Sequence, residues 1–172
     1  MAQSIQKSDL SGNGEGPGVM ETFFHGSDTQ FGIFYPKNYL VAIFPGLAEV
    51  ILAQRTLRDA GFAEDEVLAV AGDDVVHYAR EHLQKEGLAK LLMSEVMGEV
   101  SRLIGTEAIY ADQDLEMANQ GWAFLAAYAP TERKKREAWA LIEPLDPFVA
   151  RHYSIGGIEV LRGAGADHAH AA

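Results

Sequence analysis

The amino-acid sequence predicts an α+β domain of the ferredoxin-like (split βαβ) class: an antiparallel sheet with a helical insert between its second and third strands. One observation is the order of apolar and amphipathic segments, which is strand, helix, strand, a long helical stretch, strand, helix, strand. Another is that the first and third strand segments are apolar on both faces, as central strands covered on both sides must be. The 172 residues, 48% of them hydrophobic, suffice for one compact domain.

The first strand–helix–strand unit follows from three segments. Residues 39–44 (YLVAIF) are a short, continuous apolar run, which predicts a buried strand. Residues 47–60 place apolar side chains on a 3.6-residue period, and Gly61 stands where the C-terminal cap of a helix belongs. Residues 66–72 (EVLAVAG) predict the second strand.

The second unit follows an insert. Residues 73–120 are helical in pattern throughout, interrupted only by glycines. Residues 121–130 (GWAFLAAYAP) predict the third strand, and Thr131 is a good N-cap for an amphipathic helix over 132–145. Residues 147–155 (PFVARHYSI) predict the fourth strand.

The predicted sheet has one face that its own two helices do not cover. The fourth strand alternates polar and apolar residues, which is typical of an edge strand. The apolar central strands, however, need a cover on both faces. Either the inserted helices or a second subunit must supply it, so a homodimer formed through the sheet face is one prediction.

Outside residues 35–162, the composition predicts flexible ends. Residues 1–34 are largely polar and glycine-rich, and residues 163–172 have no apolar pattern, so we expect a flexible arm and a flexible tail. The start has no signal-peptide pattern and no segment has the apolar length of a membrane span. We therefore expect a soluble, cytoplasmic protein.

Charge and residue usage exclude several classes of chemistry. The chain has no cysteine, which excludes thiol catalysis and metal sites built on cysteine. The net charge of -11 disfavours nucleic acid and anionic membranes as partners. A phosphate-binding glycine loop, a dinucleotide fingerprint, a serine-nucleophile elbow and a zinc-protease helix are all absent from the sequence. No cofactor is predicted.

Four stretches within residues 35–162 resemble a known family. They are YPKNYLVAIF, LRDAGFAEDEVLAVAG, LEMANQGWAFLAAYAP and ARHYSIGGIEVL. In this order they look like a group of mostly uncharacterised bacterial proteins similar to the general stress protein, YflT-like domain. The resemblance implies a stress-associated bacterial protein without an established catalytic activity, and it carries over no catalytic residue.

The stretch DDVVHYAREH, residues 73–82, is dense in groups that bind metals or move protons. On a helix, His77 and Glu81 share one stripe while Tyr78 and His82 share another. The two histidines diverge by about 140°, so they cannot hold one ion as histidines four residues apart would. A solvated helix face with an acidic N-terminus explains the stretch, and no metal site is predicted.

Two other charged stretches have simple explanations. Acids alternate over 111–116 (ADQDLE), but the glycine that a calcium loop needs is missing and the segment is helical in pattern. The basic run 133–136 (RKKR) begins a helix, where anions bind, yet four consecutive helical residues spread around the axis. We interpret this run as a solvated face.

The fourth strand offers the best candidate site. Arg151 and Tyr153 face one way and His152 the other. A cleft under the inserted helices would place these residues at its edge and suit a small anionic or aromatic ligand, whereas a locally hydrogen-bonded core histidine is the alternative for His152. A shared site also requires His77 to approach His152. The candidate ligand-binding residues are His77, Tyr78, Glu81, Arg151, His152 and Tyr153.

These observations leave two hypotheses about function. The first is a non-enzymatic protein that acts by self-association or by binding a partner. The alternative is a small-molecule-binding protein or an enzyme, with a cleft between the sheet and the inserted helices.

Overall fold

The computed structural model describes residue 23 and residues 29–30, 33–80 and 105–163. The chain is also helical from 72 to 80, a segment called the 72–80 helix below. Short 3₁₀ turns cover Glu64–Glu66 and Glu143–Leu145. The other helices and strands are β1 (Thr29–Gln30), β2 (Ile33–Phe34), β3 (Tyr39–Phe44), α2 (Leu47–Asp59), β4 (Val67–Val70), α4 (Gly105–Asn119), β5 (Ala123–Tyr128), α5 (Glu132–Ile142), β6 (Val149–Ser154) and β7 (Gly157–Arg162).

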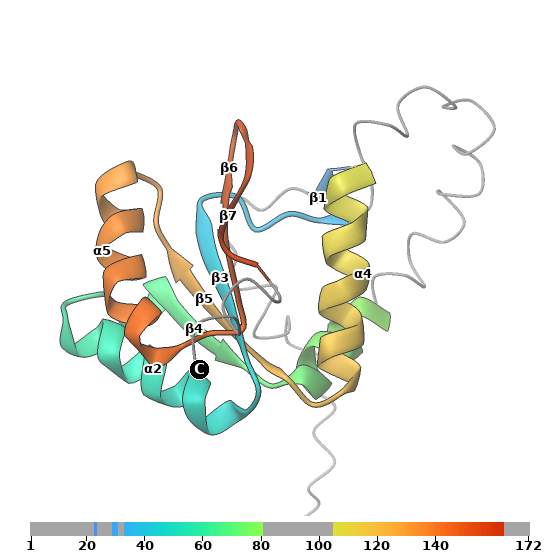
Figure 1. Ribbon diagram of the computed structural model, residues 1–172, viewed down its shortest axis with the longest axis horizontal. Helices are drawn as coiled ribbons and strands as arrows, with labels where there is room; N and C mark the ends of the chain where they lie inside the picture. The colour runs from blue at the N-terminus through green and yellow to red at the C-terminus, as the bar shows by residue number, and fades with distance from the viewer. Residues whose placement is uncertain (1–22, 24–28, 31–32, 81–104, 164–172) are drawn as a thin grey trace, which may run out of the picture.

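A five-stranded antiparallel sheet forms the centre of the fold. Its strand order is β4-β5-β3-β6-β7. Helix α2 connects β3 to β4, which lie on either side of β5, and α5 connects β5 to β6, which lie on either side of β3. Figure 1 shows α2 and α5 together on one side of the sheet and α4 on the other.

Each face of the sheet packs against its own helices, because successive strand residues point to opposite faces. Towards α2 and α5, the buried core contains strand residues such as Leu40 and Leu125 together with Val50 and Leu57 of α2. Towards α4, a second cluster joins the sheet to Ala118 and to the 72–80 helix; its strand members are Ile43, Val70, Phe124 and Val149. The central strands are therefore covered on both faces, as their apolar runs predict, and helices cover the face that the sequence leaves open.

Two helices end in the same way, each with a glycine in the left-handed region. After α2, Gly61 has φ 104°, its N–H bonds the Arg58 carbonyl, and the Phe62 N–H bonds the Leu57 carbonyl. After α4, Gly121 has φ 86° and the same two bonds recur three and five residues back. This is the Schellman arrangement, and it confirms the cap predicted at Gly61. The LRDAGF stretch thus has a purely structural explanation.

The prediction that the fourth strand lies at a sheet edge is wrong. Strand β6 lies between β3 and β7, and residues 149–153 are all buried. The sequence did not indicate β7, because Gly156 and Gly157 look like a strand end. They form instead a tight turn in which Ser154 pairs with Gly157, and Gly157 has φ 131°, which a glycine adopts at little cost.

The predicted arm, insert and tail are each described in part. Within the predicted arm, β1 pairs with β2, and the ring of Phe23 lies 5.5 Å from that of Tyr39, contacts that a polar composition does not predict. The 72–80 helix and α4 both fall within the predicted insert. Residues 81–104 and 164–172 lie outside the described residues.

Candidate functional site

The structure places the predicted site residues on opposite faces of the sheet. Arg151 faces α4, where it contacts Asp114 and the Tyr153 hydroxyl. His152 faces α5, because it pairs in register with Leu40 of the α2–α5 core, and its Nε2 lies 2.8 Å from the Ala129 carbonyl oxygen. His152 is therefore a core histidine with a local hydrogen bond, rather than a residue of the same site as Arg151.

The remaining candidates belong to the helix that follows β4. His77 is exposed and Tyr78 is half-buried on the 72–80 helix, whose Val75 and Val76 pack against the α4-facing side of the sheet. The sheet therefore lies between His77 and His152, and these two histidines do not form one site. Glu81 lies outside the described residues.

Arg151 is the centre of a buried polar cluster. Its side chain is only 3% exposed. Its Nη1 and Nη2 donate to the two carboxylate oxygens of Asp114, at 2.9 and 2.6 Å, and Nη1 also donates to the Tyr153 hydroxyl at 3.0 Å. This bidentate pair ties α4 to β6 with good geometry, since the planes of guanidinium and carboxylate match.

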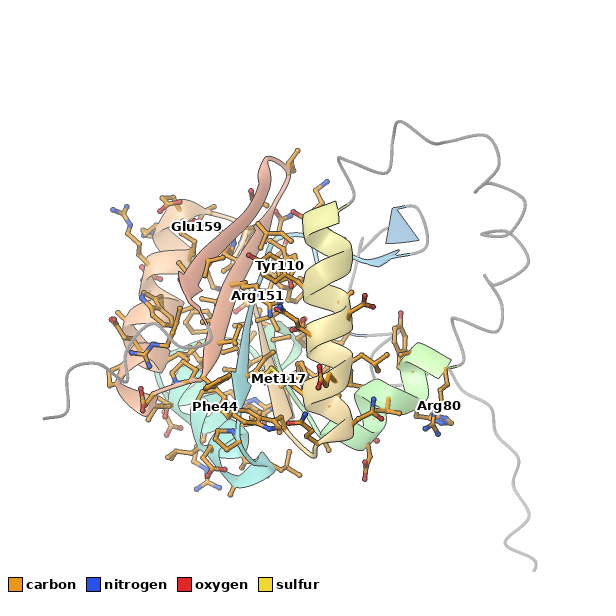
Figure 2. The ribbon with its side chains drawn as sticks, turned by 45° about the vertical axis from the view of Figure 1, so that its right-hand side comes forward. Phe44, Arg80, Tyr110, Met117, Arg151 and Glu159 are labelled. Carbon is orange, nitrogen blue, oxygen red and sulfur yellow. The ribbon has the colours of Figure 1, made fainter. Side chains whose placement is uncertain are left out.

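Tyrosines surround this pair. The ring of Tyr110, one turn before Asp114 on α4, lies 4.3 Å from the guanidinium carbon of Arg151. Tyr35 meets Tyr153 edge-to-face at 5.2 Å, and its hydroxyl donates to the Ser154 carbonyl oxygen at 2.6 Å. Figure 2 shows Tyr110 and Arg151 close together between β6 and α4.

Burial dominates the electrostatics of the cluster. It raises the pKa of Asp114, and the hydrogen bonds from Arg151 offset part of that rise. For Arg151, burial alone would lower the pKa, but the hydrogen bond and attraction to Asp114 and Tyr153 outweigh it, so its pKa is raised. Because both carboxylate oxygens of Asp114 accept hydrogen bonds, we describe the pair as guanidinium and carboxylate.

Tyr153 should make stability depend on alkaline pH. Burial, with the negative charge of Asp114 adding to it, raises the pKa of Tyr153 from 10.0 to about 12. The folded state therefore holds this proton more tightly than the unfolded state, so stability is fully present below pH 10 and is lost as the pH rises to about 12. The loss should be about 3 kcal/mol, since one pKa unit equals roughly 1.4 kcal/mol.

The measurement compares urea unfolding of the wild type and of Tyr153→Phe between pH 9 and pH 12, a range set by the ordinary value of 10.0 and the raised value of about 12. Tyr153→Phe should start less stable, because Arg151 loses an acceptor, and should decline less steeply with pH. Other groups also titrate in this range, so the result is the difference between the two proteins in how steeply the free energy of unfolding falls with pH. Equal slopes in the two proteins would contradict the assignment.

Three of the four residues in the basic run 133–136 form ion pairs with described residues. Lys134 lies 2.7 Å from Glu66, and Arg133 lies 3.6 Å from Glu137. Lys135 is buried and contacts both Glu159 of β7 and Glu132, so the predicted solvated face is wrong for this residue. A long lysine stem covers apolar surface while its ammonium group reaches a carboxylate.

Asp114 is the functional candidate that sequence reasoning missed. It falls in the stretch 111–116, which the structure places on a helix, as expected. Tyr110, Asp114 and Ala118 recur at intervals of four and so share the face of α4 that meets the sheet. That spacing was visible in the sequence, but nothing in the sequence indicated that the acid would meet a charge on a strand.

Two features, a metal site and a membrane-spanning helix, are absent from the described residues. In that part of the chain, no group of three or more histidine, cysteine, aspartate or glutamate side chains is arranged to hold a metal ion. None of the helices described is both long and apolar enough to cross a membrane.

The polar cluster around Arg151 is therefore the candidate site on geometric grounds. Comparison of the chain with protein-family models, with curated proteins and with solved structures finds no match.

Proposed function

We propose that this protein has the ferredoxin-like fold with a helical insert and acts by self-association through the outer face of α2. The strand order supports the fold assignment, because each of α2 and α5 connects two strands that have a third strand between them. The position of the 72–80 helix and α4 between β4 and β5 supports the insert.

Helix α2 has an exposed apolar face, and this is the observation that supports self-association. Leu47, Ile51 and Leu52, called the α2 stripe below, are 42%, 42% and 52% exposed. Leu47 and Ile51 lie one turn apart beside the buried face of α2, and Leu52 lies about 100° further around the helix, on its outer side. Single exposed apolar side chains are common, but three within six residues of one helix give it an apolar outer surface that suits a partner.

The charges of α2 suit a second copy of the same helix. Glu49 and Arg55 lie three residues before and three residues after Leu52. In an antiparallel pair of α2 helices centred on Leu52, Glu49 of each copy lies level with Arg55 of the other. The two helix dipoles then point in opposite directions, which is favourable. The net charge of -11 on each copy is repulsive, so we expect a weak dimer that forms at micromolar concentrations or above.

The interface proposed here differs from the homodimer through the sheet face that the sequence predicted. Helices α4 and 72–80 pack on that face. The α2 stripe contains three of the five exposed large apolar side chains in the described part of the chain, and the other two, Ile155 and Val160, lie on the β6–β7 turn and on β7. A stress-associated bacterial role belongs to the same proposal, and the resemblance of residues 35–162 to the YflT-like family supports it. A cytoplasmic location is proposed with it.

Sedimentation velocity over a concentration series tests the self-association. We expect a reversible dimer whose dissociation constant rises at least tenfold, about 1.4 kcal/mol, in Ile51→Glu. Ile155→Glu is the matched control, since it makes the same change at an 83% exposed position on the β6–β7 turn. Circular dichroism checks that both variants are folded.

A charge exchange tests the antiparallel arrangement. Glu49→Arg alone should weaken the dimer, because it places a new positive charge of one copy level with Arg55 of the other. Glu49→Arg combined with Arg55→Glu should restore the dimer. A strict monomer at the highest concentration, or a dimer that Ile51→Glu and Ile155→Glu weaken equally, would refute the proposal.

A further inference from the structure

The guanidinium of Arg151 does not use all its hydrogen-bond donors. An arginine has five N–H groups. Nη1 uses two, on Asp114 and Tyr153, and Nη2 uses one, on Asp114. The Nε–H and the second Nη2–H have no partner among the residues that the structure describes. A side chain that is 3% exposed seldom leaves two donors unpaired.

These two donors lie on one edge of the guanidinium plane. Asp114 occupies the end formed by Nη1 and Nη2, and the ring of Tyr110 covers a face. The edge formed by Nε and Nη2 points two N–H bonds in parallel at a spacing that matches the two oxygens of a carboxylate. The Nε–Nη2 edge therefore has the donor geometry to bind a pair of oxygen atoms.

We propose that the Nε–Nη2 edge of Arg151 binds the carboxylate of a small organic acid beneath α4. A singly charged carboxylate fits better than phosphate, because Asp114 already balances the charge of Arg151 and each extra buried charge is costly. Tyr35 and Tyr110 border the cluster with aromatic rings and are half-buried, which favours a planar acid such as an aromatic carboxylate.

The site lies just below the surface. The Asp114 side chain is 20% exposed, so solvent reaches the cluster beside α4. Small shifts of half-buried rings such as Tyr110 would then admit a ligand. The site faces away from α2, on the other side of the sheet, so this inference does not depend on the proposed dimer.

The test uses the full chain and the Nε–Hε signal of Arg151 in a ¹H–¹⁵N spectrum, assigned through its side-chain carbons. Benzoate, acetate and inorganic phosphate are added separately, each against sodium chloride at equal ionic strength. We expect the Arg151 signal to move along a saturating curve with benzoate, less steeply with acetate, and the melting temperature to rise by a few degrees. The signal of Arg136, which is exposed and lies outside the α2 stripe, serves as the internal control.

Each other outcome overturns the inference. A signal that no anion moves means that the edge holds only water. Movement shared with chloride or with Arg136 means general screening. Saturation with phosphate but not with benzoate or acetate refutes the choice of a carboxylate.

Two variants separate this inference from the proposed function. Arg151→Lys removes the paired donors and should abolish the benzoate-dependent rise in melting temperature, whereas Arg136→Lys, at an exposed position, should keep it. If Arg151→Lys does not fold, the titration of the wild type still decides the question. Ile51→Glu should retain the benzoate response, so the dimer and the site can fail independently.

Discussion

Replacing Asp114 with alanine should lower the free energy of unfolding by about 3–5 kcal/mol. The change leaves the guanidinium of Arg151, 3% exposed, without a counter-charge between β6 and α4. Removing one partner of a buried pair costs more than the pair itself contributes, because the remaining charge has lost its water. Urea unfolding followed by circular dichroism measures the change.

Two further variants show whether burial is the cause. Asp114→Leu combined with Arg151→Met replaces both charges with apolar groups and should recover most of the lost stability. Glu137→Ala removes one partner of an exposed pair, Arg133 and Glu137 on α5, and should cost less than about 1 kcal/mol. If Asp114→Ala costs no more than Glu137→Ala, the pair is not effectively buried.

Replacing Gly72 with alanine should destabilise the protein by about 3 kcal/mol, even though alanine favours helices more than glycine does. A Cβ atom at Gly72 would lie 2.5 Å from the carbonyl oxygens of Ala118 and Trp122. Both are backbone atoms, so neither can rotate away as a side chain would. The start of the 72–80 helix and the end of α4 would have to separate.

Gly156→Ala is the matched control for Gly72→Ala. A Cβ atom there meets nothing closer than the Ser154 hydroxyl at 3.8 Å, so we expect a change within about 0.5 kcal/mol. Urea unfolding gives both values, and hydrogen exchange should show the loss concentrated in α4 and the 72–80 helix. Equal stability of the two variants would mean that the backbone contact relaxes freely.

The central sheet was predictable because its signals are local. The apolar runs that became β3 and β5 identify buried strands by themselves, and the glycine at the end of α2 identifies a helix end. The turn before β7 was not predictable in the same way. Gly156 and Gly157 fit a strand end as well as a hairpin turn, and β7 itself mixes apolar and charged residues.

The sequence identified the β6 residues of the candidate site but not its partner on α4. Alternation along β6 correctly placed Arg151 and Tyr153 on one face and His152 on the other. Asp114 supplies the negative charge that allows Arg151 to be buried, and it lies 37 positions earlier, on a helix. A charge in a strand looks like an edge residue until its partner is known, because burial depends on pairing across the fold.

The strand pairing also determines how the chain reaches this structure. The centre of the sheet joins Tyr39 to Tyr128, so α2, β4 and α4 all lie in the loop that must close before β3 meets β5. The β6–β7 hairpin, by contrast, closes through a tight turn. Non-local pairing slows folding, because loop-closure entropy is lost before the contacts form. We therefore expect the hairpin to form early with the Arg151 charge still hydrated, and that charge to lose its water only when Asp114 of α4 reaches it.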